Sequence, residues 1–355
     1  MNPSRRRARR TAPGRLSVVG TGYRMAGQVT AEALALIERS EKLLYLVTDP
    51  LTRAWLESLN PAAESLFDSW REGRPRMEAC REMVEKILDP VRRGFEVCAA
   101  FYGHPGVCAF PAHEAVRQAR GEGYEARMLP GISSADCLFA DLGIDPAERG
   151  CQMYEASVFL YRQRRFDPAA ALILWQVSAI GLARSLAAPP VAAGLRLLAE
   201  VLAESYPADH EILLYEASLL PIRAPKVARV ALAELPKAKV GSGTVLYVPP
   251  REEVEYDWAT VERARRLDRR SARAARRPAS PRRAPGRRVQ AAVVRFLHAL
   301  ALDPRKTEDF RAHPERVPEA AALAKEDRAL LDRGDIDAIL ARFGHRQAGA
   351  TDAGA

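Results

Sequence analysis

A regular alternation of short apolar runs with amphipathic patterns constrains the fold most, and it extends from residue 16 to residue 250. The runs are rich in Val, Ile, Leu and Tyr, as strands buried on both faces are. Between several of them lie helical patterns, such as the apolar stripe of Met83, Ile87 and Val91 and the segment 191–204. This order predicts an α/β fold with helices layered on sheets. The predicted strands are residues 16–20, 42–47, 96–102, 124–129, 171–177, 211–215, 227–232 and 244–248.

A turn near residue 130 divides this region. Pro130-Gly131 predicts a turn, and a serine that follows it can cap a helix running to Gly143. We therefore expect one α/β subdomain over residues 15–130 and a second over 131–250. The later strands are partly joined by short turns, which predicts a mixed or antiparallel sheet in the second subdomain.

The positive charge is confined to two segments. Residues 263–288 hold 12 Arg and one Asp, and the first 15 residues hold six Arg, so these segments exceed the whole net charge of +9. The rest of the chain is therefore acidic. Their composition is typical of solvated segments, so we expect a disordered basic N-terminus over 1–14 and an Arg/Ala/Pro-rich linker over 251–288. Basic segments can also bind nucleic acid, but no nucleic-acid partner is predicted.

The lengths of the apolar runs and the spacing of the cysteines indicate the cellular compartment. No run approaches 18 uncharged apolar residues, and no apolar segment follows the basic N-terminus, so neither a membrane span nor a secretory signal is expected. The five Cys have no paired spacing, which predicts reduced thiols in a cytoplasmic protein.

Apolar residues return at helical spacing over 289–344, with prolines between them. We expect a small all-α domain with helices through 293–300, 321–331 and 336–343, the last two ended by glycines. A domain of this size is marginal alone, so it is expected to dock on another surface. The small and polar tail, 345–355, is predicted to be flexible.

Four segments carry candidate chemistry. Gly20-Thr21-Gly22 ends a predicted strand but lacks the third glycine of a dinucleotide fingerprint, so NAD binding is disfavoured. The segment 102–107, Tyr-Gly-His-Pro-Gly-Val, is either a ligand-binding turn or a simple tight turn. Trp175-Gln176 suits either an adenine site or the core, and the polar segment 67–80 is a loop by its chemistry alone. No histidine or cysteine spacing indicates a metal.

These segments, in this order, resemble the tetrapyrrole-methylase superfamily of S-adenosylmethionine-dependent methyltransferases. More closely, the chain resembles the borosin peptide backbone α-N-methyltransferases, the family of the omphalotin-producing enzyme. Residues 289–343 are also similar to the helical domain of borosin precursors, here fused to the enzyme. The resemblance covers about residues 15–250 and is most specific at 101–107, 123–131, 135–142, 174–177 and 247–250.

The resemblance implies two α/β subdomains with S-adenosylmethionine in the cleft between them. It also implies a homodimer, in which the substrate tail of one protomer enters the active site of the other. The peptide would pass Trp70, Arg76 and Cys80. The residues that it implies for the methyl donor are Tyr102, His104, Val107, Ser133, Ser134, Trp175, Gln176, Tyr215, Gly243 and Thr244.

Methylating a backbone amide requires that its nitrogen become a nucleophile, because its lone pair is delocalised into the carbonyl. Arg76 suits stabilisation of charge on the amide oxygen, and Tyr102 suits orientation of the amide or the donor. The resemblance implies tyrosines at two positions that hold Trp70 and Cys80 here. An indole N–H cannot accept a proton, so Cys80, four residues after Arg76, is the candidate base.

Several alternatives stay open at this point. Water could accept the proton instead of Cys80, or activity could be lost. The substrate could be the chain's own C-terminus, although 345–355 is not apolar, or a separate precursor. Besides a peptide methyltransferase, the sequence permits a catalytically silent peptide-binding scaffold. A small-molecule tetrapyrrole methyltransferase is disfavoured by the fused helical domain and the Arg76 segment.

Overall fold

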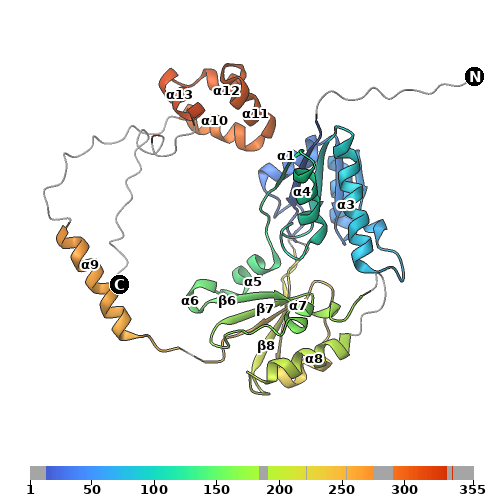
Figure 1. Cartoon of the computed structure of the whole chain (residues 1–355), viewed down its shortest axis with the longest axis vertical. Helices are drawn as coiled ribbons and strands as arrows, with labels where there is room; N and C mark the ends of the chain where they lie inside the picture. The colour runs from blue at the N-terminus through green and yellow to red at the C-terminus, as the bar shows by residue number, and fades with distance from the viewer. Residues whose placement is uncertain are drawn as a thin grey trace, which may run out of the picture. The chain divides into compact units, whose positions relative to one another are not determined.

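The computed structural model describes residues 13–183, 191–220, 222–252, 254–274, 291–333 and 338. The chain separates into two compact units, Met1–Glu253 and Val254–Ala355. Several predictions lie outside the described residues: most of the basic N-terminus, the last part of the linker, the helix over 336–343 and the tail over 345–355. Figure 1 shows the elements, coloured by residue number from blue to red.

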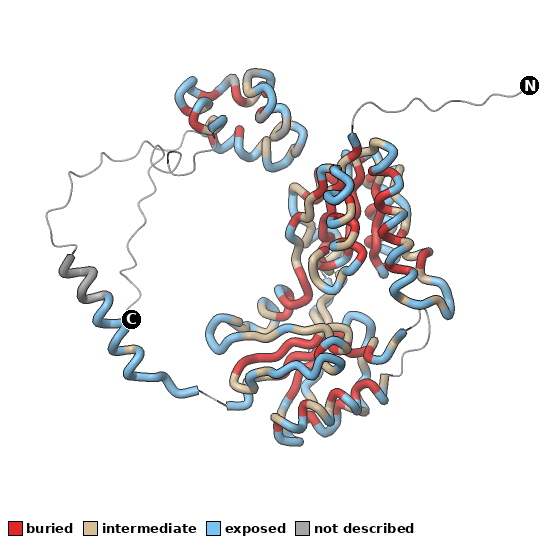
Figure 2. The backbone as a smooth tube through the Cα atoms, viewed as in Figure 1, coloured by how far each residue is buried: buried red, intermediate tan, exposed pale blue. Residues whose placement is uncertain are grey.

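The first sheet is entirely parallel, with strand order β3-β2-β4-β1-β5. Gly20 at the end of β1 lies beside Phe101 at the end of β4, so these two carboxyl ends share one edge. Buried apolar residues fill the central strands and face helices on both sides (Figure 2). The strands are β1 (Arg15–Gly20), β2 (Lys42–Leu46), β3 (Ala63–Ser65), β4 (Glu96–Phe101) and β5 (Glu125–Met128).

Each face of this sheet has its own pair of helices. Residues alternate along the strands, so Leu44 and Phe101 pack on α3 and α4, while Tyr45 and Ala100 pack on α1 and α2. A 3-10 turn, η1 (Phe67–Ser69), precedes α3. The helices are α1 (Ala31–Arg39), α2 (Pro50–Leu59), α3 (Arg76–Arg92) and α4 (Phe110–Gly121).

The second sheet is mixed, with order β6-β7-β10-β8-β9, which confirms the prediction for the later strands. Only β6 and β7 are parallel; the other neighbouring strands are antiparallel. One face packs on α5 and the other on α7 and α8. The strands are β6 (Cys151–Glu155), β7 (Ala171–Trp175), β8 (Glu211–Glu216), β9 (Lys226–Ala231) and β10 (Val245–Val248).

The helices of the second half begin with α5 (Ser134–Leu142), the helix predicted after the Pro-Gly turn. Ser133 and Asp136 form a capping box, and Gly143 ends the helix with a left-handed backbone. The others are α6 (Pro146–Arg149), α7 (Ala156–Tyr161) and α8 (Val191–Ala203), with 3-10 turns η2 (Val177–Ala179) and η3 (Leu232–Lys237).

The second unit is helical within the described residues. Its helices are α9 (Trp258–Ala274), α10 (Ala291–Leu302), α11 (Pro304–Ala312), α12 (Pro318–Ala321) and α13 (Lys325–Arg333), with a 3-10 turn η4 (Pro314–Arg316). Residues between 292 and 331, including some of α10, α11 and α12, form a small core around Phe296 and Phe310. The expected single helix over 321–331 is divided into α12 and α13. None of the described helices is long and apolar enough to cross a membrane.

The segment predicted as a linker contains a helix. Asp257 accepts hydrogen bonds from the amides of Ala259 and Thr260 and so caps α9. Ala and Arg, which dominate this segment, are strong helix formers even without apolar residues to bury. Composition identified a solvated segment but did not indicate its helical backbone.

Candidate functional site

The site lies where the carboxyl ends of β1 and β4 meet. The connection after β1 runs along one face of the sheet to β2, and the connection after β4 runs along the other face to β5. Ligands of open α/β sheets bind at such a switch point. Here Gly22 and Gly103 form an antiparallel bridge, in which each amide donates to the other's carbonyl.

Three glycine turns come together at this edge. A Cβ on Gly20 would lie 2.4 Å from the Gly103 oxygen and 3.1 Å from the Gly131 Cα. The first glycine motif, the Tyr-Gly-His-Pro-Gly turn and the Pro-Gly turn therefore touch through their backbones. His104 Nδ1 accepts from the Gly106 amide at 2.9 Å, so the imidazole folds back on its own turn.

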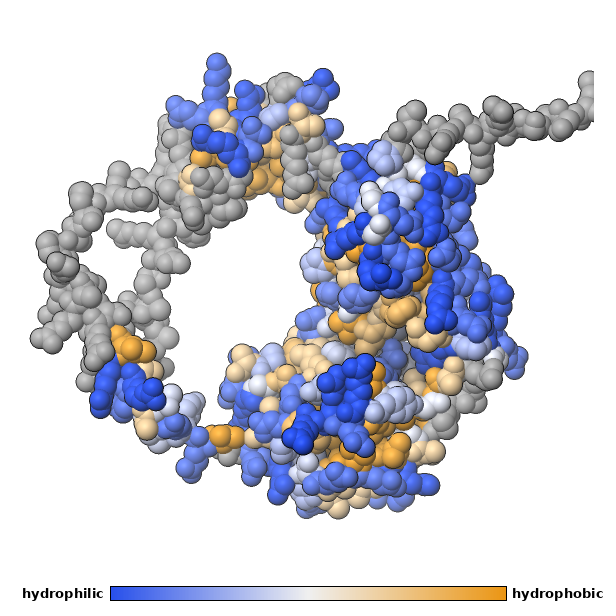
Figure 3. Space-filling view, viewed as in Figure 1, coloured by the Kyte–Doolittle hydropathy of each residue, from blue (hydrophilic) through white to orange (hydrophobic). Residues whose placement is uncertain are grey.

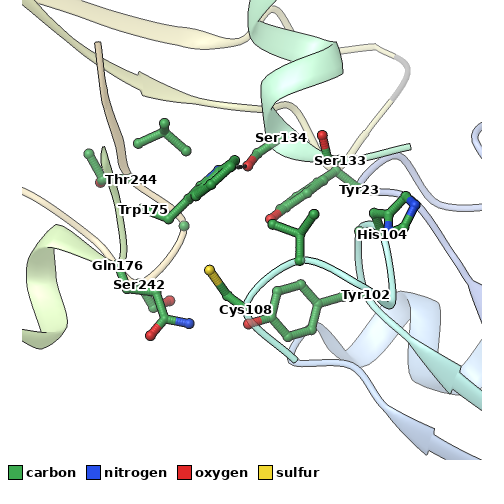
Figure 4. A pocket seen from close by; sticks show the side chains of 14 residues that line it. Tyr23, Tyr102, His104, Cys108, Ser133, Ser134, Trp175, Gln176, Ser242 and Thr244 are labelled. Atoms are coloured by element: carbon green, nitrogen blue, oxygen red, sulfur yellow. Dashed lines mark hydrogen bonds between the residues drawn. The ribbon is translucent and has the colours of Figure 1, made fainter. Parts of the chain in front are cut away.

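A narrow cavity of about 40 Å³ opens beside these turns (Figure 4). Its lining includes every residue predicted for the methyl donor except Tyr215. The lining residues are Tyr23, Tyr102, Gly103, His104, Val107, Cys108, Ser133, Ser134, Trp175, Gln176, Ser242, Gly243, Thr244 and Val245. The two sheets therefore contribute jointly to this cavity.

A second cavity of about 260 Å³ adjoins the first. Both are lined by Tyr23, Tyr102, Ser242 and Gly243. The second cavity adds the carboxylate residues Asp49 and Glu216 to its lining. Figure 3 shows apolar surface where the two halves of the α/β unit meet.

Trp175 is fixed at the end of β7. Its indole Nε1–H donates to Ser134 Oγ at 3.1 Å, which joins the second sheet to the start of α5. Gln176 follows with a left-handed backbone, φ 58°, an uncommon conformation for a residue other than glycine. Such strained residues cluster at ligand sites, and Gln176 lines the cavity.

Glu216 holds the loop that forms another wall. Thr244 Oγ1 donates to Glu216 Oε1 at 2.5 Å and accepts from the Gly241 amide at 2.7 Å. Lys226 also donates to Glu216, at 2.9 Å. The hydrogen bond from Thr244 is the largest of the effects that lower the Glu216 pKa, so this carboxylate is charged at neutral pH.

The structure does not place Tyr215 in the cavity. Its side chain is fully buried among the residues that pack β8 on α5, and its hydroxyl donates to Asp141 Oδ2 at 2.6 Å. Successive residues of a strand face opposite sides, so the next residue, Glu216, carries the side chain that faces the second cavity.

The predicted peptide-contact residues lie together near α3 but outside the narrow cavity. Arg76 begins α3, its guanidinium lies 5.5 Å from the centre of the Trp70 ring, and its amide donates to the Ala183 carbonyl at 3.0 Å. Cys80 lies four residues after Arg76, one turn further along the same helix.

Cys80, the candidate base, is not poised to lose a proton. Burial raises the pKa of the Cys80 thiol, and the opposing effect of Arg76 does not cancel it. Tyr102 has 40% of its surface exposed, but that surface lines the two cavities, and burial raises its pKa as well. The hypothesis that Arg76 converts Cys80 into a thiolate base is therefore not supported.

Residues 15–236 match the tetrapyrrole (corrin/porphyrin) methylase family. The chain belongs to this family. It is also 41% identical over 243 residues to the methyltransferase/ribosomally synthesized cyclic peptide gymnopeptides precursor of Gymnopus fusipes, a match that covers 67% of this chain and 58% of the relative. The corresponding type I borosin cyclic peptide precursor of Serendipita vermifera subsp. bescii is 38% identical over 258 residues, 70% of this chain and 62% of the relative.

A third relative matches almost end to end. The methyltransferase/ribosomally synthesized cyclic peptide omphalotin A precursor of Omphalotus olearius is 33% identical over 368 residues, covering 93% of this chain and 88% of the relative. These matches confirm the resemblance to methyltransferases fused to borosin precursors. They also confirm the α/β tetrapyrrole-methylase fold with additional C-terminal helices. The chain spans about three-fifths of the length of the first two relatives.

Sequence reasoning missed four side chains of the narrow cavity, Tyr23, Cys108, Ser242 and Val245. Each follows or adjoins a segment that was singled out: the glycines at 20 and 22, the turn over 102–107, and the strand start at 243–244. Proximity to those segments was therefore the available signal.

Proposed function

We propose that this protein is an S-adenosylmethionine-dependent methyltransferase that methylates backbone amide nitrogens of a peptide. Its family membership and its fused-precursor relatives support this proposal. The observation that carries it is the cavity between the two sheets, which gathers nine of the ten residues expected to bind the donor.

The cavity residues fit the donor chemically. Trp175 offers a ring for stacking, and Ser133, Ser134 and Thr244 offer hydroxyls to a ribose or an amino acid end. The narrow cavity alone is smaller than the roughly 300 Å³ at the lower end of ligand sites. A nucleoside-sized ligand must therefore extend into the second cavity, past the walls that the two share.

When bound, S-adenosylmethionine supplies a methyl group made electrophilic by its sulfonium. Arg76 stabilises negative charge on the oxygen of the reacting amide, because a guanidinium is always charged and donates several hydrogen bonds. Tyr102 stays protonated and donates to the amide or orients the donor. Because Cys80 also stays protonated, water accepts the amide proton. The peptide passes Trp70, Arg76 and Cys80. The protein acts as a homodimer.

Intact mass tests the proposal. The full chain is expressed in a host that makes the donor, and a C-terminal fragment is weighed, with co-expressed precursor peptides as external substrates. Increments of one CH₂ on either substrate support the proposal and distinguish the chain's own tail from a separate precursor. Arg76→Ala is expected to lose the increments while still binding S-adenosylhomocysteine in calorimetry.

The second candidate, a silent peptide-binding scaffold, is favoured by the lack of a poised base at Cys80 and Tyr102. It predicts no increment on any peptide. If calorimetry also shows no binding of S-adenosylhomocysteine, the donor site itself is wrong.

A further inference from the structure

Tyr23 lines the candidate site but is not one of the residues expected to bind the donor. It lines both the narrow cavity and the second cavity. Tyr102 does the same, and the two rings lie edge to face, with centroids 6.1 Å apart and planes at 78°. Together they form the aromatic part of the wall that the two cavities share (Figure 4).

The backbone around Tyr23 is held firmly. Gln28 Oε1 accepts from the amides of Tyr23 and Arg24 at 2.8 and 2.9 Å. The Gly22–Gly103 bridge holds the preceding residue to the β4 turn. A Cβ on Gly103 would lie 3.0 Å from Tyr23 Cε2, so the turn packs closely against the ring.

Tyr23 lines the narrow cavity together with Ser134, the residue that accepts from the Trp175 indole. Burial raises the pKa of Tyr23 far above its ordinary value, so the side chain remains a neutral phenol. Tyr23 and the hydrogen-bonded pair of Ser134 and Trp175 therefore form part of the same cavity wall.

The narrow cavity is lined by aromatic rings rather than by carboxylates, and aromatic rings can also bind a cation. Its lining includes three aromatic rings, those of Tyr23, Tyr102 and Trp175, but neither an Asp nor a Glu. A positive group there is not balanced by a carboxylate of the lining. Aromatic faces are the alternative complement, because their quadrupole attracts cations and adds about 0.5–2 kcal/mol.

We propose that Tyr23 is a further donor-binding residue, whose ring favours the positively charged sulfonium of the methyl donor over the neutral thioether of the product. This inference rests on the proposed function, because it assumes that the donor occupies these cavities. Discrimination by charge would let the site release its product in exchange for fresh donor.

The test compares binding of a cationic and a neutral ligand to the full-length protein by calorimetry. Sinefungin, which carries a protonated amine in place of the sulfonium and transfers no methyl group, represents the donor. S-adenosylhomocysteine represents the product. Tyr23→Leu is expected to reduce the preference for sinefungin over S-adenosylhomocysteine on the order of 3- to 30-fold, mainly through weaker sinefungin binding.

Two further variants serve as controls. Tyr23→Phe keeps the ring and loses only the hydroxyl, so it should retain most of the preference and show that the site still folds. Tyr161→Leu removes a tyrosine ring at the end of α7 that is 67% exposed and outside both cavities, and it should change neither affinity.

The outcomes separate the two levels of the argument. If the wild type binds both ligands and Tyr23→Leu weakens them equally, or leaves both unchanged, the charge-selective role of Tyr23 is wrong while the donor site stands. If the wild type binds neither ligand, the proposed function fails and this inference fails with it.

Discussion

Replacing Tyr215 with phenylalanine distinguishes a core residue from a donor ligand. The change removes one hydroxyl, which is buried and donates to the Asp141 carboxylate at 2.6 Å. Hydrogen bonds to charged groups contribute about 1.5–3 kcal/mol, but Asp141 is exposed, so we expect a loss of about 1–2 kcal/mol. For a unit of this size, that lowers the unfolding temperature by about 2–8 °C.

The assay combines thermal unfolding with calorimetry of S-adenosylhomocysteine. Tyr215→Phe should unfold at a lower temperature than the parent protein. Its affinity for S-adenosylhomocysteine should change by less than about twofold, well below the tenfold change that about 1.4 kcal/mol represents. Tyr247→Phe is the matched control, because Tyr247 is buried against the same helix and its hydroxyl has no hydrogen-bond partner in the described part of the chain. A Tyr215→Phe protein of normal stability and weakened ligand binding would refute the reasoning.

Three other variants test the site and its supports. Cys80→Ala should methylate at the parent rate in a time course by mass spectrometry, because burial keeps the thiol protonated; a large rate loss would restore Cys80 as the base. Hydrogen bonding from Arg74 lowers the Glu82 pKa from 4.5 to about 2. The charged Glu82 therefore stabilises the folded protein above pH 4.5, and this stabilisation is lost as the pH falls toward 2. Glu82→Gln should therefore lower the free energy of unfolding by about 1–2 kcal/mol at pH 7, measured by chemical denaturation. If the difference in stability between the parent protein and this variant does not become smaller in acid, the argument is wrong. Gly22→Ala, at φ +66° with a Cβ 2.3 Å from that of Gln28, should weaken S-adenosylhomocysteine binding, whereas unchanged affinity would mean that this loop does not shape the site.

The sequence predicted the central strands well because they are buried on both faces. Continuous apolar runs such as those at β4 and β10 require no knowledge of neighbours. Two strands escaped prediction, β3 and β6, and both lie at sheet edges with mostly half-buried residues. An edge strand is determined by pairing with a distant segment, here β2 and β7, which a local pattern does not encode.

The segment after residue 250 shows a different limit. Its composition correctly indicated that little apolar surface is buried: Tyr256, Trp258 and Leu267 are all exposed. Helix formation there depends on intrinsic propensity and on the cap at Asp257 rather than on a core. Periodicity of apolar residues, the main signal used for the other helices, cannot detect a helix of this kind.

The candidate site was predictable in its segments and less so in its side chains. The motifs at 102–107 and 133–134 line the cavity because parallel strands of the first sheet bring their carboxyl ends to one edge, a rule of topology, whereas 175–176 reaches the cavity from the second sheet. Tyr215 and Tyr23 required more. In β8 a shift of one residue decides whether a side chain enters the core beside α5 or faces the cavity, and Glu216 rather than Tyr215 has the second position. Tyr23 reaches the cavity only because Gly22 pairs with Gly103, a contact across 81 residues that neither glycine motif reveals by itself. Residues whose role depends on such a long-range backbone contact can be assigned only once the two strand ends are seen together.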